Sequence, residues 1–156
     1  VNTISQQSIA EHMYRVSVLS MYLADAINAA GVVKVDKLEV VQYALLHDWC
    51  EIHTGDIPTP AGKLISKSDL EYASMQSGSE YVKDAFYQSK GSSVVRLLVK
   101  FADVLEAYNF ISDNTIPTRH TAKVLGSLDK ALREVTSKLE KAKLGVDFRE
   151  IVEEVI

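Results

Sequence analysis

The chain has 156 residues, 47% of them hydrophobic, which suits one compact domain with a buried core. Its formal net charge of −4 excludes the broad basic surface typical of nucleic-acid-binding proteins, so we expect no nucleic-acid partner. No apolar run approaches the roughly 20 residues that span a bilayer, so we expect no membrane partner. The single cysteine, Cys50, excludes an internal disulfide, and this favours the cytoplasm.

The first half of the chain predicts two amphipathic helices. Apolar residues at helical spacing predict a helix that starts near Ser8 and ends at Gly31. Its expected inward stripe comprises Ile9, His12/Met13, Val16, Ser20, Leu23 and Ile27. A second helix is predicted to begin after the N-cap Asp36, with Glu39 as its capping-box partner, and to run to about Trp49 or beyond.

The second half predicts further helices separated by short loops. Two prolines and two glycines indicate a loop over residues 54–62, and a polar helix is expected over about 68–89. The later predicted elements are a helix over about 93–112, a loop over 113–118, a charged helix over about 121–143 and a short helix from about Asp147. The prediction is therefore an all-α bundle of about five to seven helices, with residues 1–156 forming a single domain. Because the sequence opens at Val1 without Met, we expect an N-terminal segment to be missing.

Polar residues interrupt three of the apolar segments and suggest a metal site. His47 and Asp48 close an apolar run, while His12 and Asp103 lie on the apolar faces of other predicted helices. Each such group would cost about 1–3 kcal/mol if buried unpaired, and one divalent ion could pair with all of them. Two imidazoles and two carboxylates suit zinc, cobalt or manganese.

Simpler interpretations of these residues remain open at this point. His12 could bond a backbone carbonyl in the core, and His47-Asp48 could be a polar pair favoured by the helix dipole. Asp103 could pair with Lys100 or Lys123.

Two further carboxylates follow the His47-Asp48 pair and are candidate catalytic groups. Glu51 lies three residues after Asp48, and Asp56 enters the Pro-Thr-Pro loop. A free carboxylate beside a metal site can accept a proton or protonate a leaving oxygen. Otherwise Glu51 is a solvated acid at a helix end and Asp56 is a turn former.

The order of these motifs resembles the HD-domain phosphohydrolase superfamily. The matching motifs are Glu11-His12, His47-Asp48-x-x-Glu51, the loop Thr54-Gly55-Asp56-Ile57-Pro58-Thr59-Pro60 and Lys100-Phe101-Ala102-Asp103. Within the superfamily the chain is most similar to the deoxynucleotide-hydrolysing branch, which contains bacterial 5′-deoxynucleotidases and small phage dATP triphosphohydrolases. The resemblance covers about residues 5–112.

The resemblance implies a role for each matching residue. It implies that His12, His47, Asp48 and Asp103 are metal ligands and that Glu51 and Asp56 are catalytic carboxylates near the scissile phosphate. Candidate substrate contacts are the cations Lys63, Lys67 and Arg119 and the apolar wall formed by Ile57, Pro58 and Pro60.

The resemblance also implies hydrolysis at the bond between the 5′-oxygen and the α-phosphorus of a deoxynucleotide. The expected reaction converts dATP, or another deoxynucleoside triphosphate, to the deoxynucleoside and triphosphate, and Mg could accompany the substrate phosphates. The runner-up is a 5′-deoxynucleotidase acting on monophosphates. A noncatalytic nucleotide sensor is the alternative from another class, and we expect a homo-oligomer in each case.

Overall fold

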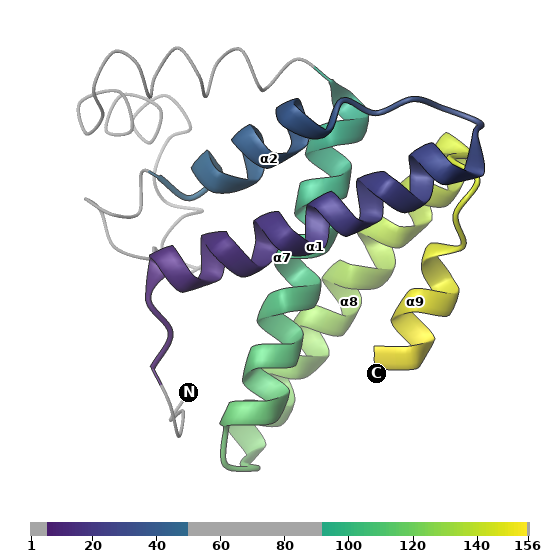
Figure 1. The fold of residues 1–156 in the computed structure, drawn as a ribbon. Coiled ribbons are helices and arrows are strands. Elements are labelled where there is room, and N and C mark those ends of the chain that lie inside the picture. The colour runs from purple at the N-terminus through teal and green to yellow at the C-terminus, as the bar shows by residue number, and fades with distance from the viewer. Residues whose placement is uncertain (1–5, 50–91, 156) are drawn as a thin grey trace, which may run out of the picture.

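The computed structural model describes residues 6–49 and 92–155, and within these ranges it contains five α-helices (Figure 1). The all-α prediction is confirmed. The loop predicted over residues 54–62 and the helix predicted over 68–89 lie outside the described residues.

Helix α1 spans Ile9–Ala30 and has the ends that the sequence predicted. The Ser8 side chain accepts a hydrogen bond from the Glu11 backbone N–H, and the Glu11 carboxylate accepts one from the Ser8 backbone N–H in return. This reciprocal capping box satisfies two of the N–H groups that a helix start leaves unpaired. At the other end Gly31 adopts a left-handed φ of 72°, which is favourable for glycine.

Helix α2 spans Lys37–Leu46, and two details of its prediction are wrong. Asp36 is the N-cap, but it accepts from the Leu38 N–H, and Glu39 accepts instead from the backbone N–H of Ser92. The Glu39 carboxylate therefore bonds the start of α7 in place of the Asp36 backbone N–H that a capping box would require. The helix also stops before Trp49, because residues 47–49 form a turn closed by a bond from the Trp49 N–H to the Leu46 carbonyl.

Helices α7, α8 and α9 span Ser93–Asn114, Arg119–Ala142 and Phe148–Val155. Helix α7 runs beyond its predicted end because Asn114 and Thr115 side chains donate to carbonyls one turn back and satisfy the helix terminus. The loop is therefore 115–118 rather than 113–118, and α8 begins two residues early, capped by Thr118.

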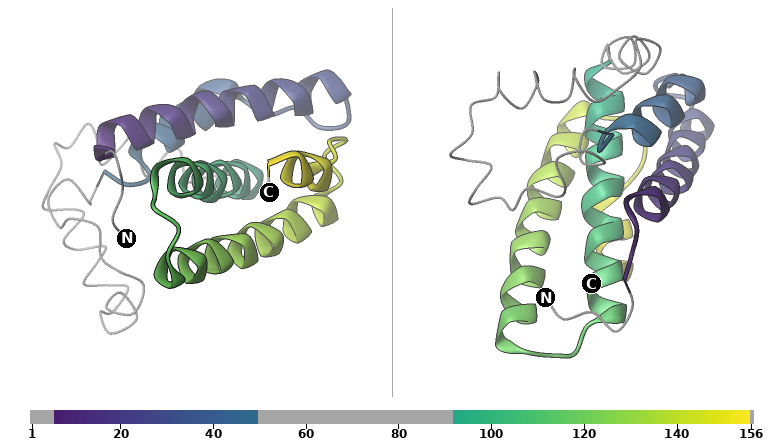
Figure 2. Two further views of the ribbon diagram at one scale, coloured as in Figure 1. Left: turned by 90° about the horizontal axis from the view of Figure 1, so that it is seen from below. Right: turned by 90° about the vertical axis from the view of Figure 1, so that its left-hand side faces the viewer.

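Helix α7 lies at the centre of the bundle, with α1 and α2 on one side of it and α8 on the other (Figure 2). Its buried face contributes more residues to the core than any other described helix, and α1 and α8 cover that face. Phe101 of α7 meets Phe148 of α9 edge to face, with ring centroids 5.2 Å apart. The polar site forms where α7 meets the N-terminal half of α1 and the turn after α2.

Candidate metal centre

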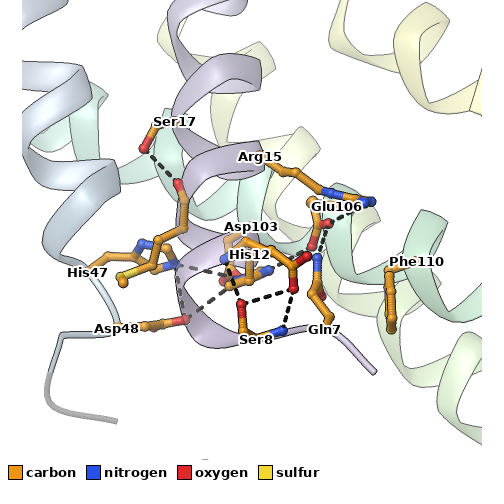
Figure 3. A network of polar contacts seen from close by, with 12 residues as sticks. Gln7, Ser8, His12, Arg15, Ser17, His47, Asp48, Asp103, Glu106 and Phe110 are labelled. Atoms are coloured by element: carbon orange, nitrogen blue, oxygen red, sulfur yellow. Dashed lines mark hydrogen bonds and ion pairs between the residues drawn. The ribbon is translucent and has the colours of Figure 1, made fainter. Parts of the chain in front are cut away.

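The four predicted ligands come together in one cluster. His12 lies in the first turns of α1, His47 and Asp48 lie in the turn after α2, and Asp103 lies midway along α7 (Figure 3). One nitrogen or oxygen from each side chain lies within 4.8 Å of the others. Three segments far apart in the sequence thus converge on one point, as the apolar pattern predicted.

Local structure explains how each side chain reaches that point. His47 and Asp48 follow directly after α2, and both side chains point toward His12 of α1 (Figure 3). The Asp48 carboxylate lies 3.5 Å from Nε2 of His12. Asp103 projects from the face of α7 that packs against α1, and its Oδ1 lies 3.2 Å from the same nitrogen.

His47 is held with one ring nitrogen aimed into the cluster. Its Nδ1 lies 2.7 Å from the Ala44 carbonyl, which can only accept, so Nδ1 carries the proton. Nε2 of His47 is buried and has no hydrogen-bond partner within the part of the chain that the structure describes. Carboxylate oxygens of Asp48 and Asp103 lie 3.3 and 3.8 Å from it. A buried imidazole nitrogen that has no hydrogen-bond partner among the described residues and faces two carboxylates is the arrangement expected of a metal-ligating histidine.

His12 is held in the same tautomer by a different partner. Its Nδ1 lies 2.6 Å from Oε2 of Glu106, one turn beyond Asp103 on α7. Nδ1 therefore carries the proton, which leaves Nε2 for the cluster. Both imidazoles present Nε2 at the same place, and their side chains are only 16% and 10% exposed.

The cluster demands positive charge. Burial opposes a charged imidazole, but hydrogen bonds to carboxylates outweigh it and raise the pKa of His12 to about 11. Burial also opposes the charged form of His47, but the nearby carboxylates of Asp103 and Asp48 outweigh it and raise the pKa of His47 to about 9. Burial by itself would raise the pKa of Asp48 and of Asp103. The adjacent imidazoles outweigh burial and hold the pKa of each carboxyl well below its usual range. The two carboxylates thus stay ionised and require cationic partners.

A divalent transition metal fits this donor set. Two imidazole nitrogens and two carboxylate oxygens form a mixed set that suits zinc, cobalt and manganese. Charge agrees as well, since two ionised carboxylates balance one divalent ion when the imidazoles are neutral. The nitrogen of His47 that has no partner among the described residues would gain one.

The alternative pairing of Asp103 is also present. Lys100 donates from Nζ to Oδ2 of Asp103 at 2.6 Å, while the other oxygen faces the histidines. The Lys100 side chain is 63% exposed, so this ion pair lies at the rim of the cluster. Pairing with Lys100 and membership of the cluster are therefore compatible.

The remaining predicted site residues fall into two groups. The first group lies outside the described residues and comprises Glu51, Asp56, Ile57, Pro58, Pro60, Lys63 and Lys67. Arg119 is described and lies exposed at the first position of α8. Asn114, the last residue of α7 before the 115–118 loop, is eleven residues beyond Asp103, or about 17 Å along the helix. The fold therefore does not bring Arg119 to the four-residue cluster within this chain.

Glu106 belongs to the site and was not assigned a role from sequence. It occupies a buried position on the apolar face of α7, three residues after Asp103. That spacing on an apolar face was the available signal, because it places a second carboxylate beside the first.

Helix α7, like the other described helices, is not long and apolar enough to cross a membrane.

Comparison with known proteins identifies related sequences. The HD domain family model matches residues 1–143. A dATP triphosphohydrolase of Salmonella phage PMBT28 is 32% identical over an alignment of 121 residues, and the match covers 73% of this chain and 59% of that protein. A dATP triphosphohydrolase of Cyanophage S-2L is 35% identical over 114 residues, 73% of this chain and 62% of that protein. A 5′-deoxynucleotidase of Enterobacter sp. (strain 638) is 28% identical over an alignment of 121 residues, and the match covers 69% of this chain and 61% of that protein.

A solved structure shares the fold. The HD phosphohydrolase DatZ of Cyanophage S-2L, bound to dA and one catalytic Zn²⁺ ion, superposes with a TM-score of 0.76 at 28% sequence identity. The match covers 99% of this chain and 86% of that one. The chain spans about three fifths of the length of the phage relatives that it matches by sequence. The family model extends over nearly all of the chain, so this protein belongs to the HD domain family.

Proposed function

We propose that this protein is a metal-dependent deoxynucleotide phosphohydrolase that cleaves the bond between the 5′-oxygen and the α-phosphorus. The preferred substrate is dATP, and the products are the deoxynucleoside and inorganic triphosphate. The observation that carries the proposal is the cluster of His12, His47, Asp48 and Asp103 in a chain of the HD domain family. Two phage relatives named dATP triphosphohydrolase support the choice of substrate.

The four clustered side chains would hold one divalent ion, with zinc first because the solved relative contains it. Cobalt and manganese suit the same ligands, and Mg could accompany the substrate phosphates. When bound, such an ion supplies Lewis acidity toward the α-phosphate and offsets the negative charge that develops during displacement. The protein contributes a rigid arrangement, because the Nδ1–H groups of both histidines are already engaged.

We assign proton transfer to Glu51 and Asp56, which follow the His47-Asp48 pair in the sequence. One of them would take a proton from the attacking water, and one would protonate the departing 5′-oxygen. Ile57, Pro58 and Pro60 would form an apolar wall against the base and deoxyribose. Lys63 and Arg119 would contact phosphate, Arg119 through a second copy of the chain if one completes the site. These assignments rest on the motifs.

Product analysis tests the proposed bond and substrate together. Zinc-loaded protein is incubated with dATP and with dAMP, and early time points are separated by anion-exchange chromatography. The expected result is deoxyadenosine and triphosphate from dATP, with no nucleoside diphosphate or monophosphate appearing first. Other deoxynucleotides should react more slowly but still measurably, because an apolar wall lowers the rate for a poorer substrate by only about 1–3 kcal/mol in activation free energy. Appearance of dADP or dAMP before the nucleoside would refute the bond assignment.

Two other functions give different outcomes in the same assay. A 5′-deoxynucleotidase, favoured by the Enterobacter relative, would release orthophosphate from dAMP and leave dATP nearly untouched. A noncatalytic sensor would bind a nucleotide without releasing any phosphate. Intact Glu51 and Asp56 argue against the sensor, because binding alone needs no proton-transfer group.

We also propose that the protein is a cytoplasmic homo-oligomer. Tyr14, Val18 and Tyr22 form a stripe at four-residue spacing along the outer face of α1, and they are 66%, 44% and 70% exposed. Exposed apolar stripes of this kind commonly bury themselves against a second subunit. Light scattering during gel filtration tests this, and Tyr22→Lys should shift the mass toward the monomer. The cytoplasmic assignment rests on the single cysteine.

A further inference from the structure

Glu106 is a buried carboxylate for which the proposed reaction provides no role. It lies on α7 three residues after Asp103, and its side chain is 7% exposed. A buried carboxylate is costly unless hydrogen bonds replace the water that it loses. Its partners therefore indicate why the fold tolerates it.

The two oxygens of Glu106 have separate partners. Oε2 lies 2.6 Å from Nδ1 of His12. Oε1 accepts from the side-chain amide of Gln7 at 2.6 Å, and a guanidinium nitrogen of Arg15 lies 3.8 Å from it (Figure 3). Gln7 and Arg15 thus hold one oxygen, so that the other is turned toward His12.

We propose that Glu106 is a positioning residue that acts through His12 and strengthens metal binding, with Gln7 orienting its carboxylate. The inference rests on the metal centre of the proposed function. A proton held between Nδ1 and a carboxylate fixes the tautomer and the ring plane, and it increases the electron density at Nε2. His12 is therefore the more strongly donating of the two imidazoles.

Comparison with His47 within the same cluster supports this assignment. The Nδ1–H of His47 donates to the neutral backbone carbonyl of Ala44, at 2.7 Å. That bond fixes the tautomer equally well but does not bring a negative charge to the ring. Removing the charge at Glu106 while keeping an acceptor should therefore make His12 resemble His47.

The test is Glu106→Gln, which preserves size and a carbonyl acceptor but removes the charge. Zinc affinity of protein stripped of metal is measured by competition with a chromophoric chelator. We expect affinity to fall by about 10-fold to 100-fold, the usual effect of losing a hydrogen-bond partner behind a ligating histidine. Glu140→Gln is the matched control, because Glu140 accepts a hydrogen bond from the Phe148 N–H and lies on α8, away from the cluster. Its zinc affinity should equal that of the parent protein.

A second readout separates positioning from a general structural effect. Long-range ¹H–¹⁵N spectra of the zinc-loaded protein report the tautomer and the Nδ1–H signal of each histidine. We expect the His12 Nδ1–H signal to lie downfield in the parent protein and to move upfield, or to be lost, in Glu106→Gln. The His47 signal should stay in place. Far-UV circular dichroism checks that the variant is folded.

If Glu106→Gln does not fold, Gln7→Ala provides the measurement. It leaves the carboxylate but removes one hydrogen bond from it, so we expect a loss of about twofold to tenfold in zinc affinity. Parent-like zinc affinity in Glu106→Gln, or in Gln7→Ala where the first variant is unfolded, would overturn the positioning role while leaving the metal centre intact. A parent protein that binds no zinc would overturn both the metal centre and this inference.

Discussion

Replacing Asp103 by Asn tests the metal centre directly, because the two side chains have the same size and differ in charge. Asp103 contacts the cluster from α7, with Oδ1 3.2 Å from His12 Nε2 and 3.8 Å from His47 Nε2. The substitution removes one of the two negative charges that face a bound divalent ion. We expect zinc affinity to fall by about 10³-fold, which exceeds the roughly 10–100-fold loss typical of an outer hydrogen-bond partner.

That loss of affinity converts into a measurable change in thermal stability. Free zinc at 1,000 times its Kd stabilises the parent protein by about 4 kcal/mol, whereas a 10³-fold weaker site leaves about 0.4 kcal/mol at the same concentration. In a domain of this size 1 kcal/mol shifts Tm by about 2–4 °C. Zinc should therefore raise the Tm of the parent by about 8–16 °C and that of Asp103→Asn by less than about 2 °C.

The assay records Tm for each protein with zinc and with a chelator, and it compares the differences. Asp103 also bonds Lys100 and His12 without metal, so the Tm in chelator will itself change, and subtraction removes that effect. Asp25→Asn is the control, because Asp25 is 55% exposed, pairs with Lys37 and lies outside the cluster. An Asp103→Asn protein with the zinc response of the parent would refute the assignment of Asp103 as a ligand.

Three further predictions address catalysis, helix capping and packing. Glu51→Gln should lower kcat by about 10²-fold or more while zinc content measured by elemental analysis stays constant, and normal turnover would show that Glu51 is misassigned. Ser8→Ala removes the hydroxyl that caps α1 at the Glu11 N–H, so urea denaturation should show a loss of about 0.5–2 kcal/mol; an unchanged midpoint would contradict the capping role. Phe101→Ala empties a fully buried position beside Phe148 and should cost about 3–5 kcal/mol in the same assay, whereas a loss below about 1 kcal/mol would mean that the core repacks there.

Helix starts and the first helix end could be predicted from sequence because their signals are local. Ser8, Asp36 and Gly31 act on backbone groups within a few residues, and all three occupy the positions that their chemistry favours. One error arose where a distant segment intervened. Glu39 had the correct spacing for a capping box, but the Ser92 N–H at the start of α7 takes its carboxylate instead.

The candidate ligands could also be predicted, because polar residues on apolar faces are rare and costly. His12, His47, Asp48 and Asp103 were selected on that basis and on their order in the chain, and the structure brings them within 4.8 Å of one another. Sequence alone left open whether each of these side chains instead paired separately with a backbone carbonyl, a helix end or a lysine. That choice required the distances between α1, the turn after α2 and α7.

Glu106 shows which features the sequence predicts and which depend on tertiary packing. Its position on the apolar stripe of α7 is a property of the sequence, as is the helical period that places it near Asp103. The same pattern would suit a carboxylate at a solvated helix edge. Only the packing of α7 against α1 decides that its oxygen meets Nδ1 of His12 at 2.6 Å.

The sequence by itself determined the helical character, most helix boundaries and the residue types available for metal chemistry, because these depend on local propensity and on period. Tertiary structure alone decided which ring nitrogen each histidine presents and which carboxylate faces which partner. Such relations depend on how three helices pack through one core, and contacts between segments that are some 90 residues apart are not encoded in any local pattern.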